Sequence, residues 1–261
     1  MQVTPGQRVL VTGASRGIGE AVATAFARRG CQVGLLARSA GDLEALARSL
    51  PGDGHRPLAA DVGDATSVTA AVEAFGHCDV AVANAGIADY GPFRSMDIDL
   101  IERMTRVNWL GTVYTVRAAL PQMLERHSGH IVIVSSGAGL RAFPGAAVYG
   151  ATKHAQKGFA EALRHELSDT GVSVTTVYPG EIKSHLHDHQ KGELPAWYGS
   201  DNAVPAEPLA EAVVEAVERD RPSVYHPPLV RSLRVAHGIS PRLADLMLRR
   251  LRGRSAAPRV R

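Results

Sequence analysis

The chain has 261 residues, of which 45% are hydrophobic and 21% charged, and its formal net charge is +3. This length allows a sizeable core without covalent cross-links, and the composition excludes collagen-like, low-complexity and largely disordered proteins. Two cysteines, Cys31 and Cys78, lack the spacing of a metal site or a disulfide framework, and no apolar run is long enough for a leader or a membrane span, so we expect reduced thiols and a cytoplasmic protein.

Short apolar runs alternate with segments of helical periodicity. We predict strands at residues 8–12, 32–37, 58–60, 80–83, 131–134, 172–177 and 223–225. Helices are expected at residues 17–29, 42–50, 64–75, 97–126, 148–170 and 209–219. Strands that alternate with such helices are typical of parallel βαβ units, and runs that are apolar on both faces fit a sheet covered on both sides. The predicted fold class is α/β: a Rossmann-type, doubly wound parallel sheet of seven strands with helices on both faces, forming one domain over residues 1–226.

A basic extension, residues 227–261, follows this domain. Residues 221–261 contain ten arginines and one aspartate, a net charge of +9, which leaves −6 on the first 220 residues. Apolar stripes beside arginines predict short helices at 229–236 and 241–251, and we expect 255–261 to be disordered. Three roles stay open for the extension: a lid over the substrate, packing on a second subunit, or peripheral contact with an anionic membrane. Without interleaved aromatic residues, nucleic-acid binding is not expected.

The first predicted strand runs directly into a glycine-rich turn. Gly13, Gly17 and Gly19 stand where this strand gives way to the next helix. Glycine permits a tight turn and lets backbone N–H groups approach a pyrophosphate at the helix N-terminus. The position of this turn in the first βαβ unit therefore indicates a dinucleotide site.

The spacing of this turn, Thr-Gly-x3-Gly-x-Gly, resembles that of the short-chain dehydrogenase/reductase family, in its shorter branch and NADP-preferring type. The longer branch of sugar-nucleotide epimerases is not favoured, because its members are longer and usually carry a different glycine spacing. Further motifs match in order and at family spacing between residue 8 and about residue 225. They are Asp61-Val62, Asn84-Ala85-Gly86, Asn108, Ser136, Tyr149-x3-Lys153 and Pro179-Gly180.

The resemblance implies four catalytic residues. Ser136 would hydrogen-bond the substrate oxygen, Tyr149 would transfer the proton, and Asn108 would anchor a water that links Lys153 to solvent. Tyr149 and Lys153 are four residues apart, so they share one helix face, where a lysine ammonium lowers the pKa of a phenol from its usual value of about 10. Ser135 is a competing serine, but the family spacing of thirteen residues before Tyr149 selects Ser136.

The resemblance also implies a set of cofactor-binding residues around the turn and the strand ends. They are Gly13, Ser15, Arg16, Gly17, Ile18, Gly19, Arg38, Asp61, Val62, Asn84, Ala85, Gly86, Tyr149, Lys153, Pro179, Gly180, Ile182 and Ser184.

The end of the second predicted strand favours NADP (NADPH) as the cofactor. An NAD site usually has an acid here that binds the ribose 2′-hydroxyl, whereas this chain has Ala37 followed by Arg38. Arg38 and Arg16 together suit a 2′-phosphate, because guanidinium groups form charge-assisted forks with phosphate. The alternative interpretation is that both arginines are solvated surface residues.

The substrate loop is predicted at about residues 181–208. Leu140, Phe143 and Trp197 are candidate walls of a pocket for a lipophilic carbonyl or alcohol, which Ser136 and Tyr149 would bind. His185, His187 and His189 alternate in the loop, but spacing alone does not make a metal site, and none is predicted.

Two other functions compete with that of an oxidoreductase: a catalytically silent NADP-binding sensor, and a module recruited to membranes by the basic extension. The intact set of Asn108, Ser136, Tyr149 and Lys153 favours the enzyme. The resemblance further implies a homodimer or homotetramer assembled through helices around residues 101–126 and 148–169. The identity of the substrate and the physiological direction are not readable from the sequence.

Overall fold

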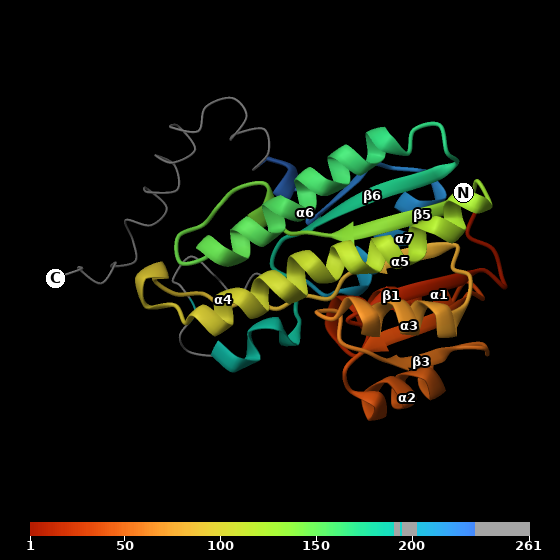
Figure 1. The fold of residues 1–261 in the computed structure, drawn as a ribbon, viewed down its shortest axis with the longest axis horizontal. Helices are drawn as coiled ribbons and strands as arrows, with labels where there is room; N and C mark the ends of the chain where they lie inside the picture. Colours follow the sequence, from red (N-terminus) through yellow and green to blue (C-terminus); the bar gives the residue numbers. More distant parts are fainter. Residues whose placement is uncertain (191–193, 195–202, 233–261) are drawn as a thin grey trace.

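A seven-stranded parallel sheet forms the centre of the molecule (Figure 1). The computed structural model describes residues 1–190, 194 and 203–232. The strand order is β3-β2-β1-β4-β5-β6-β7, and every neighbouring pair is parallel. The order reverses between β1 and β4, and ligands of such sheets bind at the carboxyl ends of the strands beside this point.

All seven predicted strands are present, with ends that differ by up to two residues. They are β1 (Arg8–Thr12), β2 (Gln32–Ala37), β3 (Arg56–Ala59), β4 (Val80–Ala83), β5 (Gly129–Val134), β6 (Val172–Pro179) and β7 (Ser223–His226). The predicted fold class is therefore confirmed.

The helices are α1 (Gly17–Ala27), α2 (Ala40–Ser49), α3 (Ala65–Phe75), α4 (Ile98–Met104), α5 (Gly111–Glu125), α6 (Ala147–Glu166) and α7 (Glu207–Glu218). The continuous helix expected at 97–126 is instead divided by a π-helical segment, η2 (Thr105–Leu110). Asn108 lies in this segment, and such interruptions are frequent at functional sites. Among the described helices, none has the length and hydrophobicity that crossing a bilayer requires.

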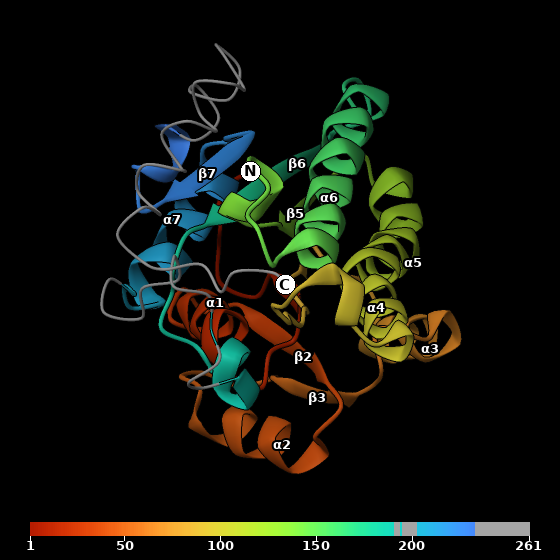
Figure 2. The same cartoon turned by 90° about the vertical axis from the view of Figure 1, so that its left-hand side faces the viewer.

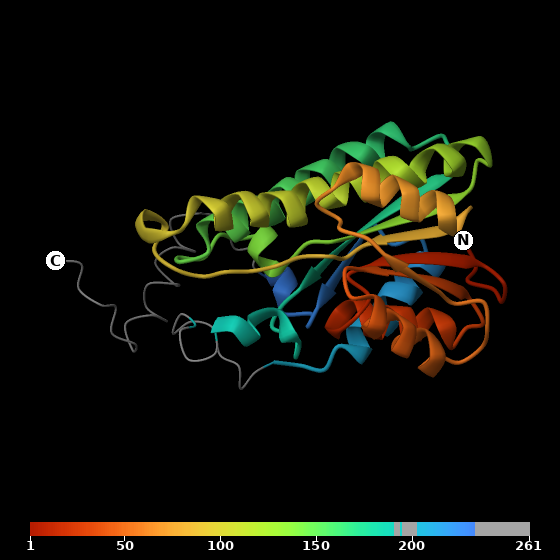
Figure 3. The same cartoon turned by 60° about the horizontal axis from the view of Figure 1, so that its bottom comes forward.

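Helices cover both faces of the sheet, as Figure 3 shows, and an apolar layer lies between the sheet and the helices on each face. Successive side chains of a strand point to opposite faces, so Val9 and Val11 of β1 pack in one layer and Leu10 in the other. The first layer contains residues of α1, α2 and α7, and the second contains residues of α3, α5 and α6. Both faces of the sheet are thus buried at its centre, which explains why β4 is apolar along its whole length.

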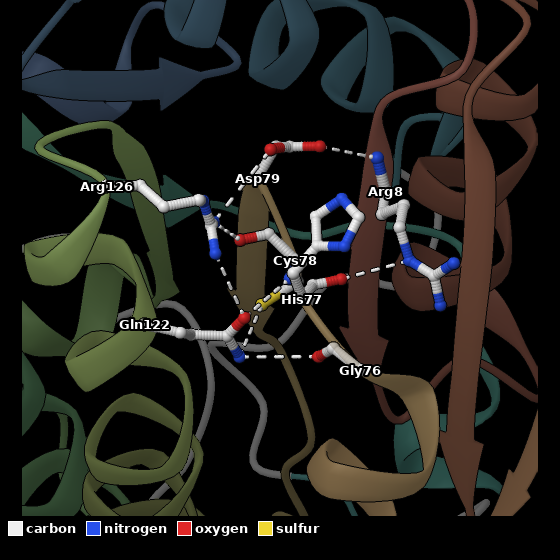
Figure 4. Close-up of polar contacts among 7 residues, drawn as sticks. All are labelled: Arg8, Gly76, His77, Cys78, Asp79, Gln122 and Arg126. Carbon is white, nitrogen blue, oxygen red and sulfur yellow. Dashed lines mark hydrogen bonds and ion pairs between the residues drawn. The ribbon is translucent and has the colours of Figure 1, made fainter.

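Side chains of β1 and α5 fasten the loop that joins α3 to β4, at the amino-terminal edge of the sheet (Figure 4). The Gln122 side-chain oxygen accepts from the N–H of Cys78 at 3.0 Å, and Arg126 donates to the Cys78 carbonyl at 2.9 Å. The Asp79 carboxylate accepts from the N–H of Arg8 at 2.8 Å. The bonds of Gln122 and Arg126 satisfy main-chain groups of the loop, and the bond of Asp79 satisfies an N–H group of β1, so this edge is closed by the protein itself.

Both cysteines are buried. Burial raises the pKa of Cys31 to about 11 and that of Cys78 to about 12. Because the thiolate is the reactive form, these thiols serve as packing residues.

Two predicted features of the C-terminal extension lie outside the described residues. The helix expected at 241–251 and the disordered end expected at 255–261 are not described, and only residues 229–232 of the helix expected at 229–236 are. In these four residues, Val230 is buried and Leu229 is exposed.

A histidine is buried in the middle of the sheet. Nε2 of His130 on β5 lies 2.7 Å from the Thr175 hydroxyl on β6, and that hydroxyl donates to the Arg221 carbonyl at 2.7 Å. Since the hydroxyl hydrogen is used on the Arg221 carbonyl, the His130 ring must donate to the hydroxyl from Nε2. Burial lowers the pKa of His130 to about 4, because desolvation disfavours the charged ring.

This histidine makes the stability dependent on pH. Its pKa is about 4 in the folded chain and about 6.5 in the unfolded chain, so the unfolded chain binds the proton first as the pH falls. The contribution of the neutral ring is complete above pH 6.5, and we expect it to fall by up to about 3 kcal/mol as the pH falls to 4. His130→Gln should flatten this dependence in urea unfolding between these pH values, whereas His154→Gln on the exposed face of α6 should not. An unchanged pH slope in His130→Gln would contradict this explanation.

Candidate active site

The carboxyl ends of β1, β4, β5 and β6 meet at one edge of the sheet, which faces the viewer in Figure 2. The glycine turn, the segment after β4 and the start of α6 come together at this edge. Parallel strands bring these motifs together although they are spread over more than 140 residues of the chain.

The glycine turn, residues 13–19, needs its glycines for two different reasons. Gly13 and Gly17 have φ values of +65° and +62°, a region that favours glycine. A Cβ on Gly19 would lie 2.1 Å from the Gly13 carbonyl oxygen, so this position has no room for a side chain. Arg16 is the N-cap of α1, and its side chain forms no capping hydrogen bond. The uncapped first turn of α1 thus offers amide donors and a positive dipole end to an anion such as a pyrophosphate.

The end of β4 is fastened to this turn. The Asn84 side-chain amide donates to the Thr12 carbonyl at 2.9 Å, and the N–H groups of Asn84 and Ala85 donate to the Thr12 hydroxyl at 3.0 and 3.1 Å. A Cβ on Gly13 would lie 2.8 Å from Cα of Ala85, so the two segments are in direct contact. Thr12, the first residue of the Thr-Gly-x3-Gly-x-Gly motif, is therefore a site-building residue, although it is not among the expected cofactor-binding residues.

The residues expected at the adenosine end lie at the ends of β2 and β3. Ala37 is half-buried, and the side chains of Arg38 and Arg16 are exposed. Val62 is buried in the core. Asp61 is exposed, and its carboxylate accepts from the N–H of Gly63 at 2.8 Å.

Four of the expected cofactor-binding residues lie at and after the end of β6, where the chain leads from the sheet to the glycine turn. They are Pro179, Gly180, Ile182 and Ser184. The N–H of Gly180, which follows Pro179 at the end of β6, donates to the His226 carbonyl at 2.7 Å. Ile182 is buried and forms a bridge with Val204. A Cβ on Gly17 would lie 3.2 Å from Cβ of Ser184, so Ser184 lies against the glycine turn.

Tyr149 and Lys153 lie on the buried face of α6, one turn apart. The Lys153 ammonium donates to the Val134 carbonyl at 3.0 Å and lies 5.7 Å from the centre of the Tyr149 ring. A Cβ on Gly86 would lie 3.6 Å from the ammonium nitrogen, so the segment after β4 also borders this group. Burial lowers the pKa of Lys153 to about 7, because the ammonium is removed from water.

The two neighbouring serines at the end of β5 have different environments. The buried Ser135 hydroxyl donates to the Lys153 carbonyl at 2.8 Å, which ties β5 to α6. The Ser136 hydroxyl oxygen accepts from the N–H of Ala138 at 3.1 Å, and Ser136 is only partly buried. The choice of Ser136 over Ser135 is consistent with this difference, because Ser135 serves the fold.

The fully buried Asn108 side chain bridges the segment after β4 and α6. Its oxygen accepts from the N–H of Ile87 at 2.8 Å, and its nitrogen donates to the Ile87 carbonyl at 2.9 Å and to the Thr152 hydroxyl at 3.1 Å. The main-chain carbonyl of Asn108 accepts from Gln156 and from the Thr112 hydroxyl, both at 2.9 Å. Asn108 thus holds three segments together. Gln156 was not singled out by the sequence, although its place on the buried face of α6 is a usable signal.

An apolar cluster surrounds Tyr149. The Tyr90 and Tyr149 rings meet edge to face, with their centres 5.7 Å apart and their planes at 86°. Phe143 and Leu186 pack against this cluster. Leu140, which the sequence suggested as a pocket wall, packs instead with Tyr178 and Val230 in a separate cluster. Trp197 lies outside the described residues.

A groove of about 600 Å³ runs between α1 and α7 and reaches the glycine turn at Gly17 and Ser184. Tyr149 does not line it. Because the residues that line this groove do not include Tyr149, the candidate for proton transfer, we assign the chemistry to the carboxyl edge of the sheet beside Tyr149. Within the described part of the chain, no cluster of three or more histidine, cysteine or acidic residues could hold a metal ion, and the side chains of His185 and His187 are not described.

The sequence and the fold both have relatives among known proteins. Residues 7–194 match the family model described as short chain dehydrogenase. The chain is 33% identical over 235 residues to the "Dehydrogenase/reductase SDR family protein 7-like" of Drosophila melanogaster, an alignment that covers 84% of this chain and 72% of that protein.

Solved structures with similar folds contain both nicotinamide cofactors. A short-chain dehydrogenase from Sphingobium yanoikuyae in complex with NADPH has a TM-score of 0.79 and 28% identity, covering 98% of this chain and 100% of that chain. A 3-oxoacyl-[acyl-carrier protein] reductase from Brucella melitensis with bound NAD has a TM-score of 0.74 and 30% identity, covering 86% and 91%.

The packing at Gly19 generates a prediction about stability. An added Cβ would meet the Gly13 carbonyl oxygen at 2.1 Å and the Asn84 side-chain nitrogen at 2.7 Å, and neither atom can move without breaking the hydrogen bonds of Asn84. We expect Gly19→Ala to lower the free energy of unfolding by more than about 2 kcal/mol, as overpacked sites do. Gly158→Ala in α6 is the matched control, because its Cβ meets nothing within 4 Å. Equal midpoints in thermal unfolding for both variants would refute the prediction.

Proposed function

Since the chain belongs to the short-chain dehydrogenase family, we propose that this oxidoreductase uses NADP(H) to interconvert a ketone or aldehyde and an alcohol on a lipophilic substrate. One observation carries the proposal: Tyr149 and Lys153 lie one turn apart on the buried face of α6, beside the end of β5 that bears Ser136. This arrangement places a proton donor, a cation and a hydroxyl at one edge of the sheet.

In the direction of reduction, Tyr149 donates its proton to the carbonyl oxygen, and the Ser136 hydroxyl hydrogen-bonds that oxygen. A bound nicotinamide supplies the hydride. The Lys153 ammonium stabilises the Tyr149 phenolate that remains. Burial alone lowers the pKa of Lys153 to about 7, and a phenolate beside it favours the charged ammonium again. The ammonium is therefore held most strongly when the phenolate forms.

Asn108 acts in this proposal by positioning the segment after β4 against α6. Its side-chain amide is engaged with Ile87 and Thr152, and Thr152 in turn donates to the Tyr149 carbonyl at 2.8 Å. The water that the family resemblance places at Asn108 stays a prediction, because the Asn108 carbonyl already accepts from Gln156 and a threonine hydroxyl.

The features of the β1–α1 turn support a nicotinamide dinucleotide. Its uncapped helix start suits a pyrophosphate, and Gly86 leaves room beside the Lys153 ammonium, which would hold the ribose hydroxyls. NADP(H) rather than NAD(H) is supported by Ala37 at the end of β2, with the exposed Arg38 and Arg16 to bind a 2′-phosphate.

A lipophilic substrate is supported by the apolar surroundings of Tyr149. Tyr90 is in the cluster that contains this residue, and Phe143 and Leu186 pack against that cluster. A site of mostly apolar lining with few polar groups is typical of small-molecule binding.

Tyr149→Phe tests the mechanism. Without the phenolic proton, turnover of a panel of ketones, aldehydes and quinones with NADPH should fall by about 10²–10⁴-fold, while NADPH binding should persist. The absorbance of the reduced nicotinamide measures turnover, and its fluorescence measures binding. Tyr114→Phe on α5 is the control and should keep the turnover of the unmodified enzyme. A Tyr149→Phe enzyme that keeps most of its turnover would disprove the role of this residue.

Ala37→Asp tests the cofactor. A carboxylate at the end of β2 would accept from a ribose 2′-hydroxyl and repel a 2′-phosphate, so the ratio of kcat/KM for NADPH to that for NADH should fall by at least about tenfold. Arg48→Ala, an exposed position on α2, should leave the ratio unchanged. If the unmodified enzyme prefers NADH, the assignment to NADP(H) is wrong.

A further inference from the structure

A buried glutamine joins two segments that are 100 residues apart in the chain. Gln190 ends the short 3₁₀ helix η4 (His185–Gln190), and only 8% of its surface is exposed. Its side-chain oxygen accepts from the N–H of Tyr90 at 2.9 Å, and its nitrogen donates to the Tyr90 carbonyl and to the Asp89 carboxylate, both at 2.9 Å. The amide therefore pairs with the main chain of Tyr90 as a neighbouring strand would, and both of its hydrogens are used.

The residue that Gln190 holds is in contact with Tyr149. The Tyr90 and Tyr149 rings are both buried and meet edge to face, with their centres 5.7 Å apart. Such contacts have a preferred geometry, so a shift of the Tyr90 main chain would change what lies against the Tyr149 ring. Gln190 is thus linked to Tyr149 through a single intervening residue.

The second contact between these two segments is weaker. His189 lies 3.3 Å from the Asp89 carboxylate, but half of its side chain is exposed, and exposed ion pairs contribute little. The three hydrogen bonds of Gln190 are shielded from water, where the loss of a partner leaves a buried polar group unsatisfied. Of these two polar contacts, that of Gln190 is therefore the stronger fastening of η4 to the segment after β4.

We propose that Gln190 is a positioning residue of the reaction, which holds η4 on the main chain of Tyr90 and so fixes the Tyr90 ring as the wall beside Tyr149. This inference rests on the proposed function of Tyr149. It assigns to η4 a part in shaping the pocket: the carbonyl substrate binds against a Tyr90 ring whose place is set by the loop. The groups that Gln190 engages, on Asp89 and Tyr90, lie outside the glycine turn, so we expect cofactor binding to depend on Gln190 less than substrate binding does.

Gln190→Glu is the variant that tests this role. It keeps the size of the side chain, removes both N–H donors and places a carboxylate next to Asp89. We expect the KM for the best carbonyl substrate of the panel to rise at least about tenfold, because buried bonds are lost and like charges are opposed. The kcat should change less than the KM, and the Kd of NADPH should stay within about twofold, since the glycine turn is not affected. His189→Gln is the matched control on the same helix and should leave the KM unchanged.

A second substitution distinguishes positioning from general damage to the fold. In the Asp89→Asn/Gln190→Glu double variant, the new amide donates to the new carboxylate, which restores one of the hydrogen bonds with its direction reversed. We expect the KM to return at least partway towards that of the unmodified enzyme. A variant that merely failed to fold would not recover, so a double variant no better than Gln190→Glu would overturn the proposal.

Tryptic cleavage after Lys183, which precedes η4 and is exposed, reports the fastening without any turnover. We expect Gln190→Glu to be cleaved faster and the double variant more slowly again. An unchanged KM of Gln190→Glu would overturn the positioning role, whether or not this variant is cleaved faster than the unmodified enzyme. If neither the unmodified enzyme nor any variant reduced a carbonyl, the proposed function would be wrong, and the positioning role that rests on it would be wrong as well. Faster cleavage of Gln190→Glu would then still support the contact between Gln190 and Tyr90.

Discussion

The candidate site depends on one lysine ammonium buried at the end of β5 with a main-chain carbonyl as its hydrogen-bond partner. Lys153 donates to Val134, the last residue of β5, and its own carbonyl accepts from Ser135, the next residue of the chain. These two bonds join α6 to the strand end from opposite sides. Because Ser136 follows Ser135 and Tyr149 lies one turn before Lys153, the same contact brings the hydroxyl and the phenol to one place. Burying a cation is costly, so a position this specific indicates a use for the charge.

Polar side chains at this edge of the sheet bind segments that are distant in the chain, whereas the layers behind it are apolar. Asn108 connects the π-helical segment to Ile87 and Thr152, and Gln190 connects η4 to Tyr90. Such networks set positions more narrowly than apolar packing does, because a displaced donor or acceptor is left unsatisfied. Both amides also reach the segment after β4, which therefore receives its conformation from two sides.

Sequence reasoning succeeded where the signal is local and failed where it depends on distant partners. The apolar run at 8–12 and the glycine turn after it identified β1 and the start of α1, because strand burial and glycine conformation act within a few residues. The π-helical segment was missed, since residues 97–126 have the periodicity of a continuous helix. The pairing of Gln190 with Tyr90 has no local signature at all. The packing of Leu140 against Tyr178 and Val230 was also not foreseen, because it joins residues that are 38 and 90 positions apart in the chain.

The two edges of the sheet are built for different purposes, and the contrast explains where chemistry can occur. At the amino-terminal edge, Gln122 and Arg126 satisfy the main chain of the loop before β4, and Asp79 of that loop accepts from the N–H of Arg8 on β1 (Figure 4). At the carboxyl edge, the start of α1 has no side-chain cap, and glycines keep side chains away from the turn. An uncapped helix start attracts an anionic group through its first amides and the positive end of the helix dipole. A phosphate-bearing cofactor therefore completes this edge in the way that protein side chains complete the other, and cofactor binding should stabilise the fold.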